Sequence, residues 1–165
     1  MYYKPEKGAE SYYVNLLISI LVHYPEIFTI YYDLVQKKCK LSYMINKPLW
    51  GNKYINFKRH FFDSFNLYFD LLGTNNTAPV IKKIIFSTMA LLELSWHTQN
   101  LSMGEINLIN ELIVNEFEKS ICSDERYLHT NQGELVEYLL PYRRENKEKH
   151  LFAFRDAGRV YVYDK

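Results

Sequence analysis

The chain has 165 residues, of which 48% are hydrophobic and 24% charged, with a formal net charge of +1. This balance excludes the weakly hydrophobic, highly charged composition of disordered chains, and the length fits one domain. The small net charge also argues against a dedicated, strongly basic nucleic-acid domain. We expect a single domain over 1–165, with a helical part at about 9–122 and a β-rich part at about 130–165.

The cysteines and apolar stretches indicate a cytoplasmic protein. Cys39 and Cys122 are far apart and match neither a disulfide framework nor a zinc-site spacing. The N-terminal residues lack the features of a signal peptide. The apolar stretches at 14–22 and 84–96 are shorter than the ~20 residues that a membrane span needs, so no membrane contact is expected.

Hydrophobic periodicity predicts three helices in the first half of the chain. The first covers 9–24. Pro25 is expected to open a second helix that reaches about Lys38, although residues 28–34 are also β-branched and aromatic enough to form a strand. After a connector at 39–52, in which 41–45 is an alternative short strand, an amphipathic helix is predicted at 53–72, ended by Gly73.

Two further helices and a β-unit complete the prediction. Pro79 is expected in the first turn of a nearly all-apolar helix that ends at about His97, and Ser102 and Glu105 form a capping box that starts the fifth helix. Short apolar runs at 135–140, 151–154 and 160–163, with a turn at 156–158, predict a β-hairpin or a three-stranded antiparallel sheet. The predicted fold class is therefore α+β, mainly α: about five helices in a compact bundle with a small C-terminal sheet.

Motifs for catalysis are absent from the sequence. There is no glycine-rich phosphate loop and no nucleophile elbow, so we predict no catalytic residue and no cofactor. The best metal-ligand combination would pair Glu93 with His97 and His60 with Asp63, each pair one helical turn apart. Such pairs arise often by chance and lack the spacing of di-iron bundles, so no metal site is predicted.

Charge placement is the most informative feature. Between Asp33 and Asp63 there is no acidic residue, and aromatic residues alternate with basic ones. Basic groups neutralise phosphates and aromatic rings stack on bases, so this composition suits a nucleic-acid surface. The predicted nucleic-acid or anion contacts are Lys37, Lys38, Lys40, Lys47, Lys53, Lys58 and Arg59.

Three functions are compatible with these observations. The first is a non-enzymatic protein-protein interaction or regulatory protein of adaptor, inhibitor or immunity type. Its partner would be another protein or a second copy, contacted by Tyr161 and Tyr163 at an exposed sheet edge. The first alternative is nucleic-acid binding by the basic 37–59 segment. The second alternative is an enzyme whose site is assembled from scattered residues.

Overall fold

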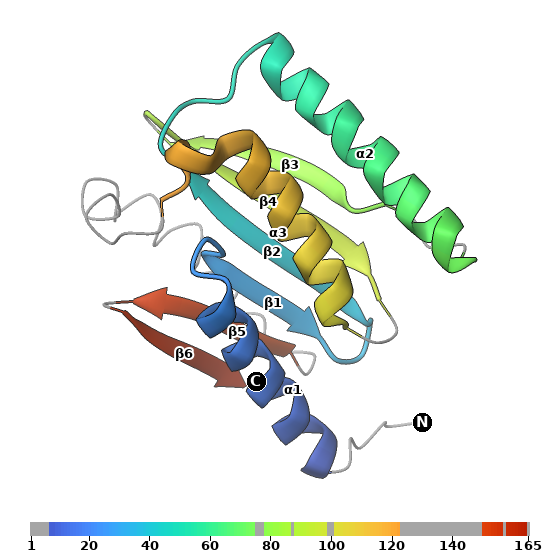
Figure 1. Cartoon of the computed structure of the whole chain (residues 1–165). Helices are drawn as coiled ribbons and strands as arrows, with labels where there is room; N and C mark the ends of the chain where they lie inside the picture. Colours follow the sequence, from blue (N-terminus) through green and yellow to red (C-terminus); the bar gives the residue numbers. More distant parts are fainter. Residues whose placement is uncertain are drawn as a thin grey trace.

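A six-stranded antiparallel sheet is the centre of the fold. The computed structural model describes residues 7–74, 78–86, 88–98, 101–122, 150–156 and 158–164. Within these ranges the strands follow the order β3-β4-β2-β1-β5-β6, and three α-helices cover one face of the sheet (Figure 1). The elements are α1 (Lys7–His23), β1 (Thr29–Asp33), β2 (Lys38–Ile45), α2 (Asn52–Leu72), β3 (Val80–Phe86), β4 (Met89–His97), α3 (Met103–Phe117), the 3-10 turn η1 (Glu118–Ser120), β5 (His150–Asp156) and β6 (Arg159–Asp164).

The predicted bundle of about five helices is wrong, because two of its segments form strands. The segment after Pro25 forms β1 and a tight turn, in which an Asp33 carboxylate oxygen accepts from the backbone N–H of Val35 and of Gln36, each at 2.8 Å. These two bonds end β1. The Asp33 carboxylate takes the place of the carbonyl acceptors that a helix would offer to these two N–H groups. The predicted fourth helix is the hairpin β3–β4, whose strands pair from Val80↔Ser95 to Phe86↔Met89.

Other predicted elements are confirmed. Helices form at α1, α2 and α3, and the Ser102 hydroxyl accepts from the Glu105 N–H at 3.3 Å as the N-cap of α3. Gly73 ends α2 in the left-handed conformation, with φ of 65°. The C-terminal hairpin is present as β5 and β6. The third strand predicted at 135–140 lies outside the described residues.

The main core lies between the sheet and the helices. In α2, four phenylalanines spaced four residues apart point inward and pack ring against ring, with centroids 4.8 to 5.7 Å apart. These rings fix α2 over the β3–β4 side of the sheet (Figure 1). The four are Phe57, Phe61, Phe65 and Phe69.

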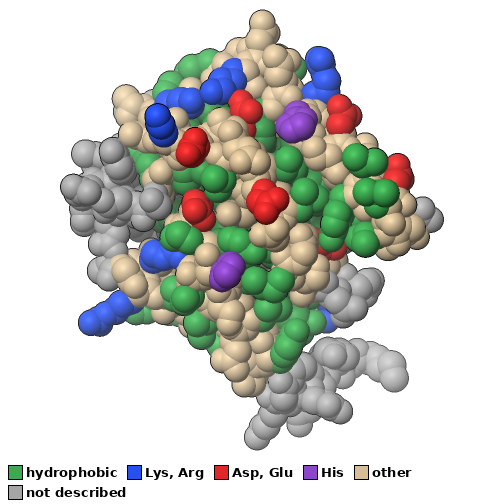
Figure 2. Space-filling model, in the orientation of Figure 1, with side chains coloured by type: hydrophobic (Ala, Val, Ile, Leu, Met, Phe, Trp, Pro, Cys, Tyr) green, Lys and Arg blue, Asp and Glu red, His purple; other side chains and the backbone are tan. Residues whose placement is uncertain are grey.

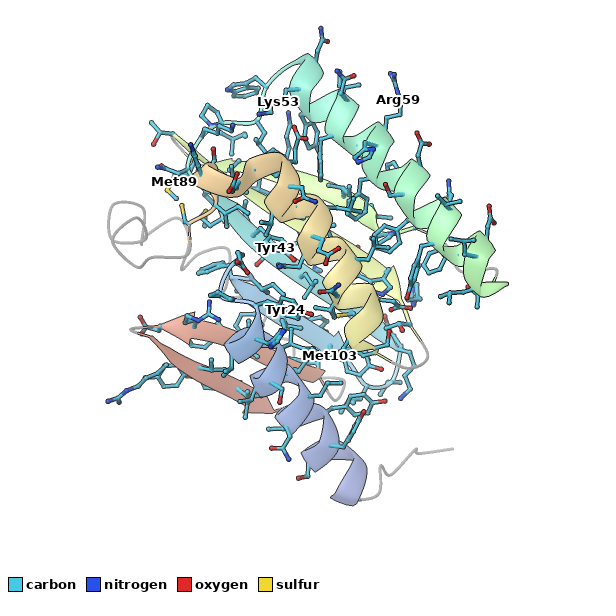
Figure 3. The ribbon with its side chains drawn as sticks, viewed as in Figure 1. Tyr24, Tyr43, Lys53, Arg59, Met89 and Met103 are labelled. Atoms are coloured by element: carbon cyan, nitrogen blue, oxygen red, sulfur yellow. The ribbon has the colours of Figure 1, made fainter. Side chains whose placement is uncertain are left out.

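Polar side chains connect the layers at the middle of the core. The Tyr43 hydroxyl of β2 donates to Asn110 Oδ1 of α3 at 3.2 Å, and the Tyr24 hydroxyl donates to Asn107 Oδ1 at 3.2 Å. Both tyrosines lie beneath or beside α3 in Figure 3. Because buried hydroxyl groups need partners, these bonds fix the position of α3 between α1 and α2.

Candidate functional site

The connection from β2 to α2 presents an exposed indole. In it Leu49 is buried, whereas Trp50 is 65% exposed. Gly51 follows with φ of 72°, a conformation that favours glycine, and precedes the first helical residue. The loop is held at both ends: the Asn46 N–H donates to the Ser120 carbonyl at 2.6 Å, and Lys83 Nζ donates to the Leu49 carbonyl at 2.6 Å.

Four lysines surround this loop and the first turns of α2. Lys83 Nζ lies 5.2 Å from the Trp50 ring centroid and 4.4 Å from that of Tyr54. Lys58 Nζ lies 5.8 Å from the same Tyr54 ring. Cations over aromatic faces are attracted by the ring quadrupole, so both lysines are held against aromatic surface. We call this set the basic corner: Lys47, Lys53, Lys58 and Lys83 with Trp50 and Tyr54.

Positive charge is crowded at the basic corner. The pKa of Lys47 is lowered, first by partial burial and second by the nearby Lys53 ammonium. Among the described residues, the one ion pair made by the four lysines joins Lys53 Nζ to Glu116 Oε1 at 4.0 Å. Lys53 is mostly exposed, so this pair contributes little. Figure 2 shows several basic side chains near the start of α2, with acidic ones over the middle of the helical face.

The structure divides the predicted basic residues into separate groups. Lys37, Lys38 and Lys40 lie at the β1–β2 turn and the start of β2, whereas Lys47 follows its end, so the length of β2 separates the groups. Lys40 also pairs with Glu93 at 3.4 Å on the sheet face without described helices. Arg59 projects outward from α2, away from Lys53 (Figure 3).

Lys83 belongs to the basic corner although it lies outside the predicted basic segment. The sequence predicts a helix there, but Lys83 lies on strand β3, which directs its side chain toward the helical face of the sheet and that of Lys82 toward the opposite face. The sequence signal for this strand is the run of isoleucines around the two lysines, since β-branched residues favour strands.

The predicted partner-contact tyrosines lie on the edge strand β6. The Phe154 ring of β5 stacks on Tyr161 and Tyr163, at 5.5 and 5.7 Å between centroids. Tyr161 is 39% and Tyr163 41% exposed. The rings form an aromatic surface at one edge of the sheet, far in strand order from β3.

Among the described residues, the combination of Glu93, His97, His60 and Asp63 does not form a metal site. Glu93 and His97 lie on strand β4, four residues apart, and are therefore not neighbours on a helical turn. Glu93 instead pairs with Lys40. In the part of the chain that the structure describes, no three metal-ligating side chains converge.

Similarity to known proteins gives no further guidance. Comparisons with protein-family models, with curated proteins and with solved structures found no match for this chain. None of the helices in the described ranges combines the length and apolar character that crossing a bilayer requires.

Proposed function

We propose that this is a non-enzymatic binding protein whose basic corner binds nucleic acid through its phosphates. The observation that supports the proposal is the placement of Lys83 against a 65% exposed Trp50, with Lys58 against the neighbouring Tyr54 and Lys47 close to Lys53. Nearby ammonium groups repel one another, and a bound phosphate would relieve that repulsion. Neutralising phosphates also releases condensed counterions, which favours binding at low salt.

A protein with a net charge of +1 can still bind a polyanion if its acidic residues lie away from its basic patch. A local field depends on where charges lie, and a patch of one sign attracts its ligand even when the whole protein is neutral. Lys58 and Lys83 lie against the same Tyr54 ring, and Lys47 lies near Lys53. Glu116 is the one carboxylate paired with these lysines among the described residues.

Lys82 and Lys83 provide a matched test, because neighbouring residues of β3 point to opposite faces of the sheet. We expect Lys83→Gln to weaken binding of a fluorescently labelled oligonucleotide, measured by anisotropy at low salt. The control Lys82→Gln has the same net charge and is expected to bind like the wild type. Equal affinities of the two variants, or no binding by the wild type, would contradict the proposal.

A second candidate is the predicted protein-protein interaction through β6. It is favoured by the half-exposed Tyr161 and Tyr163, which extend an aromatic stack to the edge of the sheet. Edge strands pair readily with other chains, and tyrosine is enriched in interface hot spots. If the partner is a second copy, sedimentation should show concentration-dependent dimers that Tyr163→Lys abolishes. Adaptor, inhibitor and immunity roles, and the cytoplasmic location, stay predictions.

A further inference from the structure

Trp50 offers a flat apolar surface at the basic corner. The adjacent Leu49 is buried and its carbonyl is bonded to Lys83, so the indole is carried on an anchored loop. Tyr54 differs from it, because that ring is half-buried and lies near two ammonium groups. Trp50 is therefore the ring of the basic corner with the most surface available to a ligand.

Whether a base can stack on the Trp50 indole depends on whether the nucleic acid is single-stranded or a duplex. In a duplex the base faces are stacked on one another, and a side chain on a protein surface reaches phosphates and groove edges only. In a single strand the bases are unstacked and can lie on an aromatic ring, which contributes to binding with little dependence on sequence.

Resting on the proposed function, we infer that the basic corner is specific for single-stranded nucleic acid, with one base stacked on Trp50. Lys83, 5.2 Å from the indole centroid, would contact a phosphate flanking that base. Lys58, which lies with Lys83 against the Tyr54 ring, would contact a neighbouring phosphate. Lys53, five residues before it and on another side of α2, would contact a phosphate further along the strand. In this arrangement the lysines neutralise phosphates and the indole stacks on a base, and neither contact depends strongly on the base sequence.

Intrinsic fluorescence tests this contact directly, since Trp50 is exposed and the other tryptophan, Trp96, is 4% exposed. We expect an oligodeoxythymidylate of about 15 nucleotides to quench the emission of the wild type. Trp50→Phe, which leaves Trp96 as the reporter, should show no such quenching. Circular dichroism should be unchanged, because the replaced side chain is exposed.

Affinity for the two forms of the ligand supplies the second measurement. Anisotropy should show the single strand bound at least tenfold more tightly than the same strand annealed to oligodeoxyadenylate. Trp50→Ala should weaken single-strand binding by roughly 5- to 100-fold and leave duplex binding unchanged. Equal binding of both forms, or an unchanged affinity of Trp50→Ala while Lys83→Gln still weakens binding, would overturn the inference and retain the proposed function. Absence of binding to either form would overturn both.

Discussion

Arg155 of β5 joins the C-terminal hairpin to the end of α1, and its replacement tests the packing of these distant segments. Its guanidinium donates to the Pro25 carbonyl at 2.6 Å, to the Ile27 carbonyl at 3.4 Å and to the Leu21 carbonyl. The last carbonyls of a helix lack intrahelical partners and carry partial negative charge. Partial burial lowers the pKa of Arg155, and the nearby Glu26 carboxylate acts in the opposite direction by favouring the charged guanidinium.

The magnitude follows from these bonds. A hydrogen bond with a charged group contributes about 1.5–3 kcal/mol, but this side chain is partly exposed and water would replace some of the lost partners. We expect Arg155→Met, which keeps the apolar stem, to lower the free energy of unfolding by about 2–3 kcal/mol in total. For a chain of this length that is roughly 4–12 °C in Tm.

Urea denaturation followed by circular dichroism measures the effect. Arg155→Lys should lie between the wild type and Arg155→Met, because it keeps the charge and loses the fork of donors. The control is Arg159→Met on β6, where an exposed arginine is removed and a change within about 0.5 kcal/mol is expected. If Arg155→Met were as stable as this control, the clamp between β5 and α1 would be refuted.

Three further predictions concern stability. Phe61 is fully buried, so Phe61→Ala should lower the free energy of unfolding by about 3–5 kcal/mol in urea denaturation. Leu71→Ala, on the exposed side of the same helix, should have almost no effect. Equal effects of the two substitutions would contradict the packing of α2. Burial raises the pKa of Glu105, so its carboxyl favours the fold at low pH, and this contribution is lost as the pH rises above about 4.5. Glu105→Gln should flatten the profile of Tm against pH above that point, and an unchanged profile would refute this. Gly73→Ala should cost about 1–2 kcal/mol because φ is positive there, and thermal denaturation without a shift would contradict that conformation.

Helices with one buried face could be predicted from the sequence, and strand β4, which is buried on both faces, could not. In α2 the phenylalanines recur every four residues among polar ones, which fixes a helical period. Strand β4 has no such contrast, because nearly all of its side chains from Met89 to Trp96 are buried. A continuous apolar run fits a buried helix and a buried strand equally well. The turn between β3 and β4 has no glycine or proline to mark it.

The candidate site was only partly predictable for a related reason. Residues near one another in sequence were expected to share a surface, but β2 runs through the basic segment and carries Lys40 to one end and Lys47 beyond the other. Lys83 reaches the same corner from β3, a long-range contact that depends on the pairing of β3 with β4. The local composition identified the lysines at the start of α2 and the presence of aromatic residues among the basic ones, and the tertiary fold determines which of these lie together.

The salt dependence of single-strand binding tests the central claim most directly. If the four lysines of the basic corner contact phosphates, a plot of log Kobs against log salt concentration should have a slope of about −2 to −3, at about −0.7 per neutralised phosphate. Lys53→Gln should reduce the steepness by about 0.7, and Lys38→Gln at the far end of β2 should not change it. A slope near zero, or an equal change in both variants, would contradict binding at the basic corner.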